Sequence, residues 1–216
     1  MKTSERQFNH VKQIWDKYLS HPFILGLNDG TLDTEKFKFY LTQDYLYLLD
    51  YTKVFALGIV KSKNEEHMQL FGDMVQMIIN SETDTHKSYL DKLSLTRESI
   101  FATPTSLTTE SYTKYMLSEA FEGGLAEITT AVLACSWSYK YIADNMDKNA
   151  EHGFYTAWID AYASEDYTKG NDVIIDLLDE LTKDYTEEQL KHLDKIIWNC
   201  SRYEGMFWDM AWNMEF

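Results

Sequence analysis

The chain has 216 residues, of which 44% are hydrophobic, 15% are aromatic and only two are proline. This length suits one sizeable hydrophobic core, and the composition excludes a disordered chain and favours a packed, helical one. Acidic residues outnumber basic ones by 35 to 20, a net charge of −15, and no cluster of Lys and Arg could neutralise a run of phosphates, so nucleic-acid binding is not expected.

Apolar spacing predicts two helices in the first quarter of the chain. The first covers about residues 4–19, where apolar residues recur every three to four positions, and the segment HPF at 21–23 ends it. A second helix is expected after Asp33, a candidate N-cap. Aromatic and aliphatic residues continue that helix with the same period over 37–55.

Three more helices are expected before residue 146. The segment SKNE at 62–65 has the order of a capping box, Ser followed three positions later by Glu, and predicts a helix through Ile79. Another helix is expected from about Thr109. The segment EGG at 122–124 predicts a bend, after which a further helix covers 125–146.

The carboxyl-terminal third is expected to be helical as well. Shorter helices are predicted at about 152–162 and 172–181, and the capping-box order TEEQ at 186–189 opens a last helix toward Trp212. No stretch alternates with period two between turn signals, so no sheet is expected. We therefore predict an all-α bundle of about seven to nine helices in a single domain over 1–216, with several helices apolar on more than one face.

The cysteines and the apolar segments bear on the compartment. Cys135 and Cys200 are too few for a disulfide framework and lack the spacing of a structural zinc site. The amino-terminal segment is polar and amphipathic, and no later window reaches the length and hydrophobicity of a membrane span. We expect a cytoplasmic protein with reduced thiols and no membrane partner.

Sequence motifs for metals and phosphates are missing. None of the six histidines has an acidic residue three positions earlier, as the Glu-x-x-His pairs of di-iron bundles require, and no HExxH motif occurs. Gly-rich phosphate loops and the GxSxG elbow of serine hydrolases are absent too. A dedicated metal site of the usual kinds is therefore not expected, which leaves carboxylates, thiols and tyrosines as candidates for chemistry.

Two carboxylates lie among apolar residues on predicted helices. Asp44 shares a helical face with Tyr47 and Tyr51, and is either a solvated surface residue or a buried carboxylate that could bind the N–H donors of an aminopyrimidine edge. Glu204 shares a stripe with Cys200. It is either a surface residue paired with a cation or a general acid whose pKa is raised by apolar neighbours.

The two thiols have the same alternatives. Cys135 lies in AVLACSWSYKYI at 131–142, and free cysteine usually behaves as a small buried hydrophobe, so the residue is either a core filler or a nucleophile. Residue types alone do not choose between Cys135 and Cys200. Three further tyrosines have two possible roles: their hydroxyls could polarise a thiol, or their rings could pack in the core. These are Tyr112, Tyr139 and Tyr162.

Five ordered segments together resemble the TenA or thiaminase II family, whose members share a heme-oxygenase-like helical fold. They are FxxYLxQDYxYLxxY at 37–51, EAFEGGLAE at 119–127, AxLxCSWSYxYI at 131–142, WIDAYAS at 158–164 and SRYEGMFWDMAW at 201–212. The resemblance covers essentially the full length. Several blocks in order are more specific than any one of them.

The resemblance implies roles for seven residues. It makes Cys135 the nucleophile, Glu204 the acid/base residue and Asp44 the carboxylate that holds the pyrimidine edge. The tyrosines form two pairs: Tyr47 and Tyr112 as catalytic residues beside the thiol, Tyr139 and Tyr162 as substrate contacts. One departure is Gly205, where many relatives carry a large residue after the glutamate, and it leaves open the shape of the pocket but not the identity of the acid.

The implied activity is hydrolysis of 4-amino-5-aminomethyl-2-methylpyrimidine to the 5-hydroxymethyl pyrimidine and ammonia, in the salvage of degraded thiamine. Cleavage of thiamine into pyrimidine and thiazole is a second implied reaction. Cys135 would add to the ring while Glu204 protonates a ring nitrogen, and the disrupted ring would expel its leaving group. A homotetramer without a cofactor is implied as well.

Two other classes of protein stay open. A non-catalytic regulatory or ligand-binding helical protein would be expected to lose Cys, Glu or Asp at the matched positions, and all three are present. An oxidative enzyme of the same fold would need a quinone, haem or iron. The resemblance leaves open which of the aminomethyl compound, its formyl derivative or thiamine is preferred.

Overall fold

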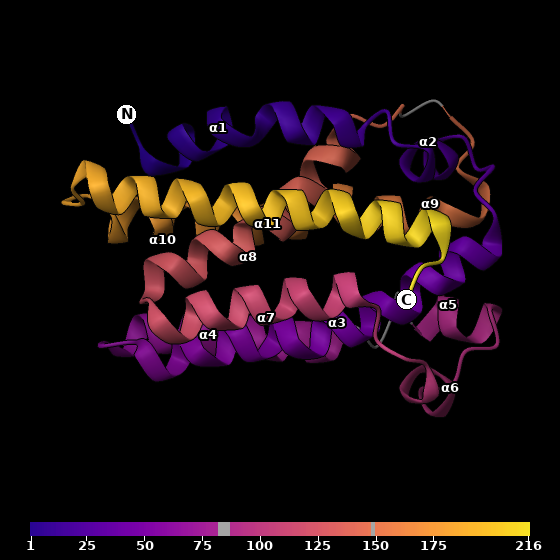
Figure 1. The fold of residues 1–216 in the computed structure, drawn as a ribbon, viewed down its shortest axis with the longest axis horizontal. Coiled ribbons are helices and arrows are strands. Elements are labelled where there is room, and N and C mark those ends of the chain that lie inside the picture. Colours follow the sequence, from indigo (N-terminus) through magenta and orange to yellow (C-terminus); the bar gives the residue numbers. More distant parts are fainter. Residues whose placement is uncertain (82–86, 148–149) are drawn as a thin grey trace.

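The computed structural model describes residues 1–81, 87–147 and 150–216, and in these ranges the chain forms an all-α fold without strands, as predicted (Figure 1). The helices are α1 (Thr3–Tyr18), α2 (Pro22–Asn28), α3 (Thr34–Lys61), α4 (Glu65–Ser81), α5 (Lys87–Lys92), α6 (Arg97–Ala102), α7 (Leu107–Glu122), α8 (Leu125–Asp144), α9 (Thr156–Ala163), α10 (Glu165–Leu181) and α11 (Glu187–Asn213). A 3-10 turn, Gly153–Tyr155, precedes α9. None of the helices in the described ranges is long and apolar enough to cross a membrane.

The described residues hold eleven α-helices, so the expected seven to nine were too few. The missed ones include α2, α5 and α6, which have only seven, six and six residues. Helices this short do not show the repeated apolar spacing on which the prediction depends. The segment HPF does end α1, but it also starts α2, because Pro22 fits the first helical position and the ring of His21 accepts a hydrogen bond from the amide of Phe23.

The predicted start of α3 is confirmed and that of α4 is wrong. Asp33 caps α3, since its carboxylate accepts a backbone amide hydrogen bond of 2.8 Å. The order SKNE predicts Ser62 as the next cap, but the Ser62 hydroxyl donates to the carbonyl of Gly58 at 2.7 Å and ends α3. The next helix, α4, begins at Glu65, and the side chain of the preceding Asn64 accepts from the amide of His67 at 2.8 Å.

The later helix boundaries mostly agree with the sequence. Gly123 ends α7 at the predicted bend, and the capping box of Thr186 and Gln189 opens α11. Ser164 starts α10 well before the predicted residue 172, because its hydroxyl accepts an amide hydrogen bond at the helix end. This earlier start places Tyr167 on α10, and its hydroxyl donates to the carbonyl of Ser136 on α8 at 3.0 Å.

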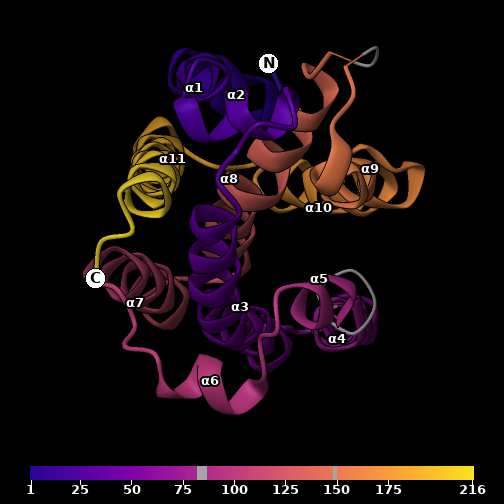
Figure 2. The same cartoon turned by 90° about the vertical axis from the view of Figure 1, so that its right-hand side faces the viewer.

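Helix α8 lies near the centre of the bundle. Figure 2 shows α3 and α8 near the middle, with α1, α11, α7, α4 and α10 around them, and α8 contacts α1, α3, α7, α9, α10 and α11. Its buried residues therefore face several directions, for example Ile128, Val132, Ala134 and Ile142. A central position explains why this helix is apolar on more than one face.

Contacts with α1 fix the position of α11. Figures 1 and 2 show α11 lying between α1 and α7. The Arg6 guanidinium donates to Asp194 at 2.6 and 2.9 Å, and the indole of Trp15 donates to the Ser201 hydroxyl at 3.0 Å. The hydroxyl of Tyr18 donates to the Ser201 carbonyl, one turn before Glu204. These long-range bonds hold the segment of α11 that carries the candidate acid.

Candidate active site

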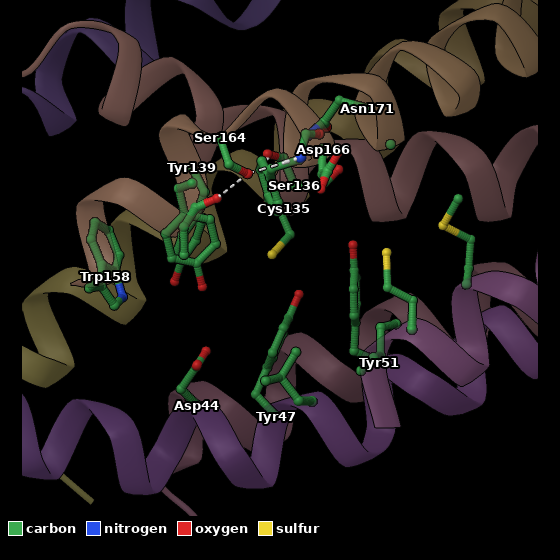
Figure 3. Close-up of a pocket in the computed structure, with 18 of the residues that line it drawn as sticks. Asp44, Tyr47, Tyr51, Cys135, Ser136, Tyr139, Trp158, Ser164, Asp166 and Asn171 are labelled. Atoms are coloured by element: carbon green, nitrogen blue, oxygen red, sulfur yellow. Dashed lines mark hydrogen bonds between the residues drawn. The ribbon is translucent and has the colours of Figure 1, made fainter. Parts of the chain in front are cut away.

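A cavity of about 370 Å³ lies between α3, α8, α9 and α10, with α4 at one side (Figure 3). This volume falls within the range of about 300–1,000 Å³ that is typical of small-molecule sites. Five of the seven predicted site residues line it: Asp44, Tyr47, Cys135, Tyr139 and Tyr162. The other two, Tyr112 and Glu204, are not part of its wall. They lie behind the thiol.

Cys135 is half-buried, and in Figure 3 its sulfur points toward the Tyr47 hydroxyl. The thiol lies within hydrogen-bonding reach of Tyr47 and Glu204, and the bonds to both residues affect the pKa of the thiol. Burial raises the pKa of Cys135, and the neighbouring Glu204 carboxyl raises it further. The resting thiol is therefore protonated at neutral pH, and its conversion to a nucleophile requires a proton acceptor.

Cys200 has a different position. Its side chain is 0% exposed on α11, and it does not line the cavity. Burial also raises the pKa of this thiol. Of the two thiols that residue types could not distinguish, only Cys135 is thus accessible to a ligand in the cavity.

Glu204 is 2% exposed, which rules out the alternative of a surface residue paired with a cation. The hydroxyl of Tyr112 donates to its Oε1 at 2.8 Å, and Cys135 is its other hydrogen-bonding neighbour. Burial raises the pKa of Glu204 to about 8, although the bonds from Tyr112 and Cys135 act in the opposite direction. At neutral pH Glu204 is mostly protonated, as a general acid must be.

Asp44 is buried, so the alternative of a solvated surface residue is wrong as well. Figure 3 shows its carboxylate extending from α3 into the cavity, opposite Tyr139 and Trp158. The charge of Asp44 contributes to the raised pKa of both Glu204 and Cys135. A buried carboxylate at this position is suited to accept N–H bonds from a ligand.

Aromatic side chains form one wall of the cavity. The ring of Tyr162 packs against Tyr139 and Trp158 with centroid distances of 4.9 and 4.6 Å. Burial raises the pKa of both tyrosines, so their hydroxyls keep their protons. Tyr40 donates to the Tyr139 hydroxyl at 3.2 Å from the core side. The wall thus offers flat apolar faces to an aromatic ligand and hydroxyl groups at its edge.

Residue types and spacing did not single out Tyr40 and Trp158, although both lie within segments quoted for the family resemblance. Trp158 lines the cavity, and its indole donates to the Tyr40 hydroxyl at 3.4 Å. Ser136 and Asn171 also line the cavity without having been predicted. The sequence offers only weak signals for them: Ser136 is the residue after Cys135, and Asn171 lies on a helix that faces Cys135.

Gly205, whose effect on the pocket the sequence left open, does not line the cavity. A Cβ atom at this position would lie 3.4 Å from Cε1 of Tyr18, on α1, and Gly205 is not part of the cavity wall. The ring of Tyr18 occupies the space that a larger residue would need. The glycine at this position therefore affects the packing of α1 against α11.

The charged residues in the cavity wall are both acidic, Asp44 and Asp166, and no Lys, Arg or His is among the described residues that line it. Within the described ranges, no three His, Cys, Asp or Glu side chains come together as a metal site requires. The chemistry that the site can support with its own groups is proton transfer and thiol addition to a bound, electron-poor ring.

Known proteins resemble the chain over nearly its whole length. Residues 8–214 match the model of the TENA/THI-4/PQQC family. An aminopyrimidine aminohydrolase from Helicobacter pylori is 41% identical over 215 residues, 98% of this chain and 99% of that protein. One from Bacillus subtilis is 30% identical over 216 residues, 100% and 92% of the two chains. The solved structure of a TenA homologue from P. horikoshii OT3 covers 99% of both chains with a TM-score of 0.90 and 29% identity.

Proposed function

Because the chain belongs to the TENA/THI-4/PQQC family, we propose that it is an aminopyrimidine aminohydrolase that acts in thiamine salvage. The proposed reaction converts 4-amino-5-aminomethyl-2-methylpyrimidine to the 5-hydroxymethyl pyrimidine and ammonia, within a single helical domain over 1–216. The relatives from Helicobacter pylori and Bacillus subtilis carry the name of this activity. The observation that carries the proposal is the Cys135 thiol at the cavity wall, with Glu204 behind it and Asp44 on the facing helix.

The substrate ring is proposed to lie against the aromatic wall. Asp44 accepts hydrogen bonds from the aminopyrimidine edge, while Tyr139 and Tyr162 contact the ring. In this pose a ring carbon faces Cys135 and a ring nitrogen is directed toward Glu204. Since Glu204 lies behind the thiol, the ring must sit deep in the cavity for that proton transfer.

The first step is proposed to be thiol addition with a coupled proton exchange. Glu204 gives its proton to the ring nitrogen and receives the proton of Cys135, as the sulfur forms a bond to the ring carbon. Both groups are mostly protonated at neutral pH before the step. The exchange therefore leaves no net charge on the buried pair, which avoids the large cost of an unpaired buried ion. Tyr47 and Tyr112 supply hydroxyl donors to the thiol and the carboxyl.

The adduct is no longer aromatic, so the bond to the exocyclic nitrogen can break. The protonated amine departs as ammonia and takes the bonding electron pair, leaving an exocyclic alkene on the ring. Water then adds to the exocyclic carbon and gives up a proton to the released ammonia. Glu204 takes back the proton of the ring nitrogen and returns a proton to the Cys135 sulfur as the carbon–sulfur bond breaks, which restores the aromatic ring. Covalent catalysis divides one difficult displacement into easier steps.

The experiment that tests the nucleophile compares the two thiols. Release of hydroxymethyl pyrimidine and ammonia is measured for wild type, Cys135→Ala and Cys200→Ala. We expect kcat to fall by about 10³-fold or more in Cys135→Ala, as for other covalent catalysts, and to stay within about threefold of wild type in Cys200→Ala. Equal rates for Cys135→Ala and wild type would overturn the assignment.

Thiamine cleavage is proposed as a second reaction of the same site, with the thiazole in place of ammonia as the leaving group. The homotetramer that the family resemblance implies stays a prediction, and so does the cytoplasmic location expected from the cysteines and the apolar segments. A non-catalytic role is the second candidate, and it would be favoured by binding of the aminopyrimidine without release of either product.

A further inference from the structure

Two buried oxygen atoms in the cavity wall accept no hydrogen bond from the described residues: Ser136 Oγ on α8 and Asn171 Oδ1 on α10. Asn171 is only 3% exposed. A buried polar atom without a partner costs about 1–3 kcal/mol, so such atoms are rare unless they serve a ligand or water. Here both atoms belong to the same cavity.

The orientation of the Asn171 amide is fixed by its other end. Its Nδ2 donates to the backbone carbonyl of Tyr167 at 3.0 Å, and a carbonyl can only accept, so the nitrogen must lie on that side. The Tyr167 hydroxyl is no partner for Asn171 Oδ1, because its hydrogen is donated to the Ser136 carbonyl at 3.0 Å. That bond also joins α10 to α8, the two helices that carry these oxygens.

Ser136 is likewise left with an acceptor. The neighbouring Tyr51 hydroxyl donates its hydrogen to the carbonyl of Val132 at 2.9 Å, so it has no proton to offer Ser136 Oγ. The Ser136 lone pairs are therefore free for a ligand. Together the two side chains present hydrogen-bond acceptors to the cavity. They are suited to bind a ligand group that donates, such as an N–H group.

The position of these oxygens relates them to the leaving group. In Figure 3, Ser136 and Asn171 lie on one side of Cys135 and Asp44 lies on the other. Because Ser136, Asn171 and Cys135 line the same cavity, a substituent on a ring held between Asp44 and Cys135 shares that cavity with the two oxygens. Asp166 also lines this end of the cavity, so its charge favours a cation there.

We propose that Ser136 and Asn171 form a subsite for the departing amino nitrogen, which they bind as a primary ammonium group. This proposal rests on the proposed function and adds a specificity element to it. The ammonium form is the one that departs as neutral ammonia when the carbon–nitrogen bond breaks, so the subsite holds the leaving group in the required protonation state. The thiazolium group of thiamine has no N–H to donate, and the subsite therefore favours the aminomethyl substrate.

The kinetic test compares leaving groups. For Ser136→Ala and Asn171→Leu, we expect kcat/KM to fall by about 10- to 100-fold with the aminomethyl pyrimidine, the effect of losing a hydrogen bond to a charged group, and to change less than about threefold with thiamine. Asn171→Asp keeps the acceptor and should retain the preference for the aminomethyl compound. Asn145→Leu is a matched control, because Asn145 Nδ2 donates to the carbonyl of Tyr141 in the same way at an exposed position.

Equal losses with both substrates in Asn171→Leu, or no loss with either, would overturn the subsite. A binding test separates its failure from that of the proposed function. In a Cys135→Ala background, calorimetry compares the aminomethyl pyrimidine with 4-amino-2,5-dimethylpyrimidine, which lacks the nitrogen. We expect about tenfold tighter binding of the amine and loss of this preference on adding Asn171→Leu. Equal binding of the two pyrimidines would refute the subsite. Tighter binding of the amine, together with a wild type that releases no product, would refute the proposed reaction alone.

Discussion

Replacement of Glu204 by Gln should change how the stability of the protein depends on pH. The pKa of Glu204 is raised from 4.5 to about 8 by burial. The folded protein keeps a proton that the unfolded chain loses above pH 4.5, so the free energy of unfolding falls as pH rises from about 4.5 to about 8 and levels off above that. Gln has nearly the same shape, carries no charge and can still accept the hydrogen bond from Tyr112.

The magnitude follows from the two pKa values of Glu204. Proton linkage gives a destabilisation from this group of about 2 kcal/mol at pH 6 and about 4 kcal/mol at pH 8. The free energy of unfolding of Glu204→Gln, relative to wild type, should therefore rise by about 2 kcal/mol between these pH values. Other titrating groups cancel, since both proteins contain them.

Urea unfolding at pH 6 and pH 8, at one protein concentration, measures this difference. Glu122→Gln serves as the control, because Glu122 is exposed at the end of α7, and its effect should be the same at both pH values. A stability difference between Glu204→Gln and wild type that stayed constant from pH 6 to pH 8 would show that folded Glu204 is ionised. Glu204 could then not serve as the proposed proton donor.

Two further substitutions test the site and the core. Tyr112→Phe removes the hydrogen bond that lowers the pKa of Glu204, so the alkaline limb of the pH profile of kcat/KM should move to higher pH, and an unmoved limb would contradict the contact. Phe37→Ala should lower the free energy of unfolding by about 3–5 kcal/mol in urea, because this buried ring packs on four other aromatic rings. Leu107→Ala, at a 74% exposed position, should leave the free energy of unfolding unchanged.

The long helices could be predicted because buried apolar residues recur with the helical period over many turns. In α3 the apolar period persists from Phe37 to Phe55, and Asp33 marks its start by a local hydrogen bond. The helices α2 and α6 are too short for such a repeat, and their formation depends on caps and neighbours. Ser62 shows the limit of local motifs, since the same hydroxyl that fits a capping box is used to end the preceding helix.

The site could be predicted only as far as whole segments could be matched. Spacing places Cys200 on one stripe with Glu204, but it cannot show that Cys135 on α8 faces the cavity while Cys200 is enclosed. Asn171 was missed for a similar reason. Its importance depends on the contact between α10 and α8, and on an amide whose nitrogen is already bonded, which a sequence does not reveal.

The pairing of α1 with α11 also has a consequence during synthesis of the chain. Arg6 and Asp194 form a hydrogen bond although they are 188 positions apart. At translation rates of about 5–20 residues per second, α1 emerges roughly 10–40 s before its partner exists. During that interval the apolar side chains Val11 and Trp15 lack the helix that covers them in the folded protein. Cys135 on α8 therefore gains its neighbour Glu204 only after α11 has been made, and early folding of the amino-terminal half cannot complete this part of the cavity.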